Sequence, residues 1–177
     1  TVTGVQTCAL PISAFLNAIT PTYSGDLNGG EALSGWALSV TSPNVDSGLN
    51  SGGVDILLSY DATTGKVYGI AVGATTAETV DSKAGVIFTI SVNSTTGAVT
   101  TTQYGAIDHL PESLNTSNDN FEAFLGTELV KLSATYTATD ADNDQVTSTI
   151  STDLGGNIKF VDSVPDPVSR SEEHTSE

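Results

Sequence analysis

The sequence predicts an all-β fold, an antiparallel sandwich or barrel built from hairpins. Thr, Ser, Val and Gly dominate the chain, methionine is absent, and Leu, Glu and Lys are too sparse for long surface helices. Short apolar runs recur with turn residues between them, as in sandwiches and barrels. Apolar and polar residues also alternate, for example in 132–139, which indicates strands buried on one face only.

Each expected strand lies between two turn signals. In chain order, the expected strands are residues 36–40, 54–60, 66–73, 86–93, 98–104, 129–139, 146–154 and 158–161. Their alternation assigns the following side chains to the core: Val86, Phe88, Ile90, Val92, Leu132, Ala134, Tyr136, Ala138, Val146, Ile150 and Leu154. We expect Trp36 and Tyr104 to pack in the core rather than to stack on a sugar.

Two connections are near copies of each other, and one is long. Residues 61–65 (DATTG) and 93–97 (NSTTG) both end in a glycine that can adopt positive φ, so both predict β-hairpins. Residues 108–126 form the long irregular stretch, which could hold one short helix around 121–125. A loop of this length inside a compact domain often carries function.

Both ends of the chain read as translated sequencing adapter. The adapter agatcggaagagcacacgtctgaa encodes residues 170–177, and its reverse complement in a shifted frame completes the codon of Val5, encodes residues 6–12 and begins the codon of Ser13. Such segments are excluded from fold reasoning. The expected organisation is therefore artefact (1–13), linker (14–31), β-sandwich repeat domain (32–165), the start of an inter-repeat linker (166–169) and artefact (170–177). Cys8, the single cysteine, falls in the first artefact, so no thiol chemistry is argued.

The charge balance excludes several partners. The formal net charge is −16, from 5 basic and 21 acidic residues. Without Arg170, Glu172, Glu173 and Glu177 it is 4 − 18 = −14. Such a field repels phosphate backbones and anionic membranes, and it attracts cations. No apolar run approaches the length of a membrane span. We expect no nucleic-acid partner and no membrane insertion by this segment.

Asp140, Asp142 and Asp144 alternate inside the turn between two Thr-rich strands. Alternate side chains in a curling segment can converge on one point, and a hard divalent cation requires several oxygen ligands there. The pattern predicts a calcium site, with a solvated acidic turn as the other reading. An EF-hand is excluded, because Gln145 and Ser151 stand where that loop needs glycine and glutamate.

Weaker cation sites are expected in two further segments. Asp162 and Asp166, beside the stiffening Pro165 and Pro167, lie where one repeat would pass to the next, and they could form a junction calcium site. Within the long loop, Asp108, Asp119 and Glu122 could form another, although a solvated loop is the simpler interpretation.

The order of several short motifs resembles a known repeat. These are WALSV (36–40), VDSGL (45–49), GKVYG (65–69), VIFTISV (86–92), TGAVTTTQY (96–104), AIDH (106–109), TDADND (139–144) and DLGGNIKFVD (153–162). Together they resemble the long tandem repeat of giant, type I-secreted RTX-type adhesins of Gram-negative bacteria. The resemblance implies an extracellular, Ig-like β-sandwich at the cell surface, joined to neighbouring repeats of the same chain and stiffened by calcium. The glycine- and aspartate-rich nonapeptides of RTX proteins are absent from these residues.

The preferred reading is therefore a structural extender repeat with no enzymatic activity, acting in adhesion and biofilm formation while another part of the protein binds the surface ligand. One alternative is a carbohydrate- or ligand-binding sandwich whose site lies in 108–126; exposed aromatic residues there would favour it. The second is a fragment of a secreted hydrolase using Asp108 and His109, although the sequence designates no nucleophile or second carboxylate for them.

Overall fold

A computed structural model describes residues 4–6, 30–109 and 122–161 of the chain. These residues form antiparallel strands and no helix, which confirms the predicted all-β class. The strands are β1 (Gly4–Gln6), β2 (Gly30–Val40), β3 (Val45–Ser51), β4 (Val54–Asp61), β5 (Lys66–Ile70), β6 (Glu78–Val80), β7 (Lys83–Val92), β8 (Val99–Gln103), β9 (Glu122–Phe124), β10 (Val130–Thr139), β11 (Gln145–Asp153) and β12 (Lys159–Val161).

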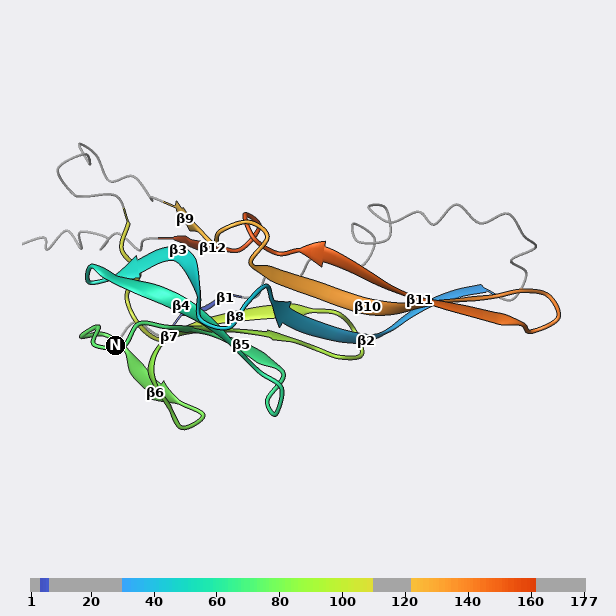
Figure 1. Cartoon of the computed structure of the whole chain (residues 1–177), viewed down its shortest axis with the longest axis horizontal. Helices are drawn as coiled ribbons and strands as arrows, with labels where there is room; N and C mark the ends of the chain where they lie inside the picture. Colours follow the sequence, from blue (N-terminus) through green and yellow to red (C-terminus); the bar gives the residue numbers. More distant parts are fainter. Residues whose placement is uncertain (1–3, 7–29, 110–121, 162–177) are drawn as a thin grey trace, which may run out of the picture.

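The strands make a sandwich of two unequal layers (Figure 1). The large sheet has the order β1-β8-β7-β5-β4-β3, with β6 added beside β7. The second sheet, β11-β10-β2, packs over it through β2, which contacts β4, β5 and β7. A small third sheet joins β9 to β12. Figure 1 also shows that the β10–β11 hairpin extends well past the end of the large sheet.

Two strands begin ahead of the expected N-terminal boundary of the domain, residue 32. β1 pairs with β8, Gly4 opposite Gln103, and lies inside the segment attributed to the adapter. β2 begins at Gly30, slightly ahead of the expected domain boundary at residue 32.

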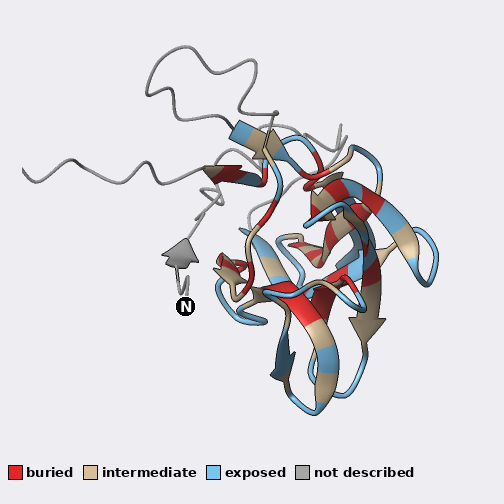
Figure 2. Cartoon of the chain, turned by 90° about the vertical axis from the view of Figure 1, so that its left-hand side faces the viewer, coloured by how far each residue is buried: buried red, intermediate tan, exposed pale blue. Residues whose placement is uncertain are grey.

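The core lies between the two sheets, where burial is greatest (Figure 2). Trp36 and Leu38 of β2 and Leu132 of β10 face Ile56 and Leu58 of β4, and all are at most 4 % exposed. Each fully buried aliphatic side chain contributes about 1.5–3 kcal/mol relative to an exposed one. Trp36 therefore packs in the core as expected, whereas Tyr104 is only half-buried.

Two glycines make room for the large aromatic side chains. A Cβ on Gly69 of β5 would lie 2.4 Å from the ring of Phe88, its cross-strand partner in β7. A Cβ on Gly97 would lie 2.7 Å from the indole of Trp36. Phe88 in turn meets Phe160 of β12 at a ring-centroid distance of 4.9 Å, which ties the small third sheet to the core.

The two near-copied connections form the same hairpin turn, as predicted. In one, Gly65 N donates to Asp61 O at 2.8 Å, and in the other Gly97 N donates to Asn93 O at 2.8 Å. Both glycines have positive φ, +67° and +72°. In each turn the first side chain also accepts a backbone N–H, from Thr63 to Asp61 Oδ1 and from Thr95 to Asn93 Oδ1.

The expected short helix around 121–125 is wrong over its described residues. Glu122–Phe124 is strand β9, and it pairs with Lys159–Val161 through the register Lys159 opposite Phe124. Lys159 Nζ also reaches Glu122 Oε1 at 2.5 Å. Cross-strand pairing, which is distant in sequence, overrides the weak local helical preference of this segment.

Core assignment fails at the far end of the β10–β11 hairpin. Leu132, Ala134, Tyr136 and Ala138 are buried as predicted. Val146, however, is 54 % exposed, and Ile150 and Val92 are only half-buried. β11 is an outer strand of its sheet, and the end of the hairpin projects beyond the large sheet (Figure 1). Val146 is exposed there although its cross-strand partner Ala138 in β10 is buried.

β3 and β6 are strands that alternation did not reveal. β3 contains a register shift between Asp46 and Asn50 and a positive-φ Gly48, and it buries alternate residues Ser47, Leu49 and Ser51, of which only Leu49 is apolar. The three-residue β6 is too short to show any period.

Candidate metal centre

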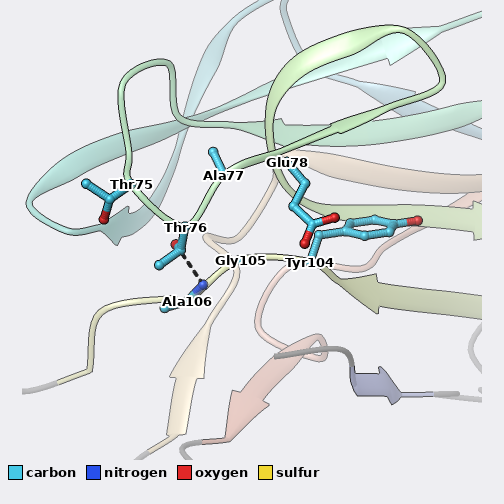
Figure 3. Close-up of a pocket in the computed structure, with 7 residues that line it drawn as sticks. All are labelled: Thr75, Thr76, Ala77, Glu78, Tyr104, Gly105 and Ala106. Carbon is cyan, nitrogen blue, oxygen red and sulfur yellow. Dashed lines mark hydrogen bonds between the residues drawn. The ribbon is translucent and has the colours of Figure 1, made fainter. Parts of the chain in front are cut away.

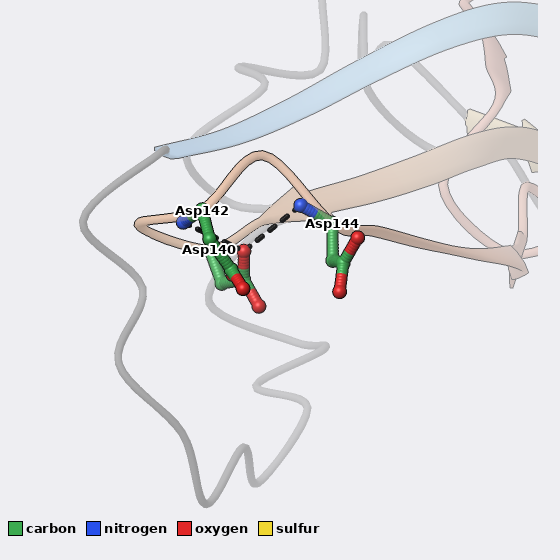
Figure 4. A group of neighbouring side chains, drawn as sticks. All are labelled: Asp140, Asp142 and Asp144. Atoms are coloured by element: carbon green, nitrogen blue, oxygen red, sulfur yellow. Dashed lines mark hydrogen bonds between the residues drawn. The ribbon is translucent and has the colours of Figure 1, made fainter.

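The three alternating aspartates lie at the tip of the β10–β11 hairpin (residues 140–144), here called the hairpin tip (Figure 4). Asp140 N donates to Asp144 O at 3.1 Å and closes the turn. Asp140 Oδ1 accepts the backbone N–H groups of Asp142 and Asp144, at 3.2 and 2.9 Å. Asn143 supplies the positive φ, +70°, that the turn requires. One Asp140 oxygen is thus committed to holding the turn.

The remaining carboxylate oxygens gather on one side of the tip. Figure 4 shows the three side chains pointing the same way. One oxygen from each of Asp140, Asp142 and Asp144 lies within 4.8 Å of the other two, with Asp140 half-buried and the others exposed. Ligands of one calcium ion, each 2.3–2.6 Å from it, can be at most about 5 Å apart. The spacing therefore fits a shared ion, with backbone carbonyls or water needed to complete a shell of six to eight oxygens.

The electrostatics of the tip favour the charged form of its central residue. The pKa of Asp140 is lowered from 3.8, first by its hydrogen bond with the Asp142 carboxyl and then by the N–H groups of Asp144 and Asp142, while partial desolvation opposes the shift. Because a calcium ligand must be deprotonated, the lowered pKa keeps Asp140 available as a ligand further into the acid range.

The lysines of the chain are all engaged elsewhere. Lys66 pairs with Asp81 at 2.8 Å, Lys83 with Asp61 at 3.0 Å, Lys131 with Glu128 at 3.5 Å and Lys159 with Glu122 at 2.5 Å. The fifth basic residue, Arg170, lies outside the described residues. Within the described part of the chain, no lysine pairs with the hairpin tip.

A comparison with protein-family models assigns most of the chain to one family. Residues 5–155 match the model of the DUF5801 domain, a domain of unknown function. The chain belongs to the DUF5801 family. Neither the curated proteins nor the solved structures contain a match. Within the described residues of this DUF5801 domain, no helix has the length and apolarity to cross a membrane.

Asp108 serves as an anchor for a turn in this DUF5801 domain. Its two carboxylate oxygens accept the backbone N–H groups of Gly52 and Gly53, both at 2.7 Å. Those glycines form the β3–β4 turn with φ of +58° and +75°. Charge-assisted bonds of this kind are about twice as strong as neutral ones. The described contacts thus give Asp108 a structural partner at each oxygen, and Glu122, its expected neighbour in a cation site, pairs with Lys159 instead.

His109 also makes a structural contact. Its Nε2 lies 3.3 Å from the carbonyl oxygen of Phe160 in β12. Asp108 and His109 therefore each contact the backbone of a different element, with no mutual hydrogen bond among the described contacts. The remaining expected ligands, Asp119, Asp162 and Asp166, lie outside the described residues.

Sequence reasoning missed a second acidic site, here called the paired corner (Asp61, Lys66, Tyr68, Asp81 and Lys83). Asp81 Oδ2 accepts from Lys66 Nζ at 2.8 Å and from the hydroxyl of the buried Tyr68 at 2.7 Å. Lys83 pairs with Asp61 and lies 5.2 Å from the centre of the Tyr68 ring. The β4–β5 and β6–β7 turns bring these residues together, and only the pairing of β5 and β6 with β7 makes them neighbours.

Proposed function

We propose that this DUF5801 domain is a structural extender repeat of a secreted bacterial surface adhesin, stiffened by calcium. The observation that carries the proposal is the hairpin tip, where three carboxylates gather and no lysine of the described chain offsets their charge. Like charges this close repel one another, and an external cation with oxygen preference relieves that repulsion. The resemblance to RTX-type adhesin repeats supplies the extracellular setting on a Gram-negative cell.

The tip is placed where an ion would have mechanical effect. It closes a hairpin whose distal β11 residues, 145–149, are exposed and which extends past the large sheet (Figure 1). Little apolar packing supports the β11 side of this end, although Ala138 of β10 is buried there, so a bound ion would add to its rigidity. In the proposed array, neighbouring repeats of the same chain follow one another, and Asp162 and Asp166 contribute to calcium at the junction.

Calcium would act through linkage. An ion that binds the folded tip and not the unfolded chain stabilises the folded state by mass action. Rigidity would then follow the calcium concentration outside the cell, and the repeat would project a distant ligand-binding domain without any chemistry of its own.

Thermal unfolding in EDTA and in millimolar calcium tests the proposal. At a free calcium concentration about a hundred times Kd, we expect Tm to rise by about 5 to 10 °C. The variant Asp140→Asn, Asp142→Asn, Asp144→Asn should lose that rise. Asparagine is chosen because its side-chain oxygen can still accept backbone N–H groups of the turn, as Asn93 Oδ1 does from Thr95 and Thr96 in the turn at 93–97.

A charge-matched control separates the site from general electrostatics. The variant Glu78→Gln, Glu122→Gln, Glu128→Gln removes as many negative charges from other exposed positions and should keep the calcium-induced rise. If the wild type has the same Tm in EDTA and in calcium, the hairpin tip does not bind calcium as proposed. An equal response in the two triple variants would attribute any rise to net charge instead.

One observation favours a second candidate function, a ligand-binding module. Phe124 of β9 is 47 % exposed and lines a cavity of about 450 Å³ together with Asn50, Asp108 and His109. Exposed aromatic rings at a concave surface are common in ligand sites. A ligand screen in which Phe124→Ala abolishes binding while the melting curve is unchanged would favour this function over the structural one.

A further inference from the structure

A second cavity, far from the hairpin tip in sequence, lies where the β5–β6 connection meets the segment after β8 (Figure 3). Its volume is about 380 Å³, within the range of small-molecule sites. Thr75, Thr76 and Glu78 form one wall and Tyr104 and Ala106 the other.

Hydrogen bonds hold the two walls together. Ala106 N donates to Thr76 Oγ1 at 3.0 Å, as Figure 3 shows. The buried Ser51 hydroxyl donates to Ala106 O at 2.6 Å and lies 3.3 Å from Thr76 Oγ1. Tyr104 N donates to Ile87 O at 2.7 Å, which fixes the backbone that carries the ring. The cavity is therefore formed before any ligand arrives, and preorganisation lowers the entropic cost of binding.

Gly105 is necessary for this arrangement. A Cβ there would lie 2.8 Å from Thr76 O and 2.8 Å from Ile87 Cδ1. The two walls can approach this closely only because residue 105 has no side chain, so the shape of the cavity depends on that one position.

The polar groups that remain at the cavity are few and well defined. The Glu78 carboxylate lies beside the Tyr104 ring in Figure 3, and Thr75 lies beyond Thr76 on the same wall. Neither the Glu78 side chain nor the Thr75 side chain makes a hydrogen bond to another described residue, although the Glu78 backbone lies in the β6–β7 pair. A carboxylate accepts hydrogen bonds, a threonine hydroxyl donates and accepts them, and an aromatic ring offers an apolar face.

The geometry points to a binding site for one neutral sugar residue in this cavity. A sugar has an apolar C–H face that can lie on the Tyr104 ring and adjacent hydroxyls that can donate to both Glu78 oxygens. Anionic ligands are disfavoured by the net charge of −16. This site is distinct from the Phe124 cavity and requires no calcium, so it goes beyond the proposed extender function and can fail or succeed independently of it.

Saturation-transfer NMR and calorimetry of the full chain in EDTA test this site. The probes are glucose, galactose, mannose, N-acetylglucosamine, lactose, cellobiose and maltose, with tetramethylammonium chloride as a cationic probe. We expect at least one sugar to bind with Kd on the order of 1 mM. Tyr104→Ala should weaken that binding about tenfold and Glu78→Gln by a similar factor. Tyr104→Phe should retain it, because the ring face remains.

Glu128→Gln is the matched control, since Glu128 is exposed and lies outside the cavity. It should leave sugar binding unchanged, and melting curves must show that every variant is folded. Failure of the wild type to bind any sugar of the panel would overturn the proposal. So would sugar binding that folded Tyr104→Ala and Glu78→Gln both retain, or binding of tetramethylammonium alone.

Discussion

The paired corner and the hairpin tip are both clusters of acidic residues at β-turns, yet they solve the same electrostatic problem differently. At the corner the chain supplies its own cations, because Lys66 and Lys83 reach Asp81 and Asp61. At the tip three carboxylates meet with no lysine among their described partners. An acidic cluster predicts an external cation only where the fold has not already provided an internal one.

The turns at the two sites are held by similar hydrogen bonds from backbone N–H groups to a side-chain oxygen. The two sites therefore differ in their charged side chains and not in how their turns are built. Asp61 and Asp140 each accept backbone N–H groups of their own turn, and Asn93 does so in the copied turn. Asn93 shows that this role needs an oxygen and not a charge. The charges at the tip, which the turn does not require, are therefore available for a ligand.

Supplying a lysine at the tip should convert it into a second paired corner. Val146 is 54 % exposed and lies near the start of β11 (Gln145–Asp153), two residues after Asp144 of the hairpin tip. Val146→Lys places an ammonium beside the tip. We expect Tm in EDTA to rise and the calcium-induced rise of about 5 to 10 °C to shrink by at least half. Thermal unfolding of the variant in EDTA and in millimolar calcium measures both effects.

Two controls show whether position matters. Val146→Gln has a similar length without charge and should keep the calcium response. Val72→Lys adds the same charge in another part of the molecule, at a residue that is 80 % exposed. This variant should also keep the calcium-induced rise in Tm. If Val72→Lys and Val146→Lys reduce the response equally, the tip is not a specific site and the contrast with the corner fails.

At the paired corner, loss of a single hydroxyl should lower the stability of the domain, and the size of that loss should not depend on calcium. Tyr68→Phe removes the buried hydroxyl that donates to Asp81 at 2.7 Å. We expect a loss of about 1 kcal/mol of unfolding free energy, or roughly 2 to 4 °C in Tm, equal in EDTA and in calcium. Tyr60→Phe, on β4, is the control and should change Tm little, since the Tyr60 hydroxyl has no hydrogen bond to a described residue. A calcium-dependent effect of Tyr68→Phe would mean that the two sites are coupled.

The local sequence pattern was enough to predict most of the long strands and the gathering of three aspartates at the hairpin tip, but it did not predict the paired corner. The alternation in residues 132–138 predicts β10 correctly because that strand has one buried and one open face. Asp140, Asp142 and Asp144 are neighbours in sequence, so their turn alone brings them together. Asp61 and Asp81 belong to different hairpins, and their partners become visible only once the sheet order is known.

The difference between local pattern and contacts distant in sequence also explains what the sequence did not predict. Val146 fits the apolar period of β11, but its burial depends on whether another layer extends that far, which the period does not encode. The partners that Asp108 has in the structure, Gly52 and Gly53, lie on a turn distant in sequence, so the sequence did not reveal its structural role. Glu122–Phe124 became a strand because Lys159–Val161 was available to pair with it. In each case a contact distant in sequence decided the outcome.

The paired corner and the hairpin tip should also differ in how their contributions to stability depend on pH. Hydrogen bonding from Lys83 lowers the pKa of Asp61 below 3.8, and hydrogen bonds from Lys66 and Tyr68 lower that of Asp81. Their contribution is present above pH 3.8 and is lost as pH falls through the lowered values. Hydrogen bonding to the same carboxylates raises the pKa of Lys66 and of Lys83 above 10.5. That contribution is complete below pH 10.5 and is lost as pH rises through the raised values.

The corner should therefore lose stability at both ends of the pH range, whereas the tip should lose it only in acid. The pKa of Asp140 is lowered by Asp142 and by backbone N–H groups, and no lysine takes part. Denaturant unfolding in EDTA from about pH 3 to about pH 11 measures both limbs. Lys66→Gln should flatten the alkaline limb and part of the acid limb, because Asp81 loses its cation. The triple asparagine variant of the tip should alter the acid limb alone, and a change in its alkaline limb would show that a lysine does reach the tip in solution.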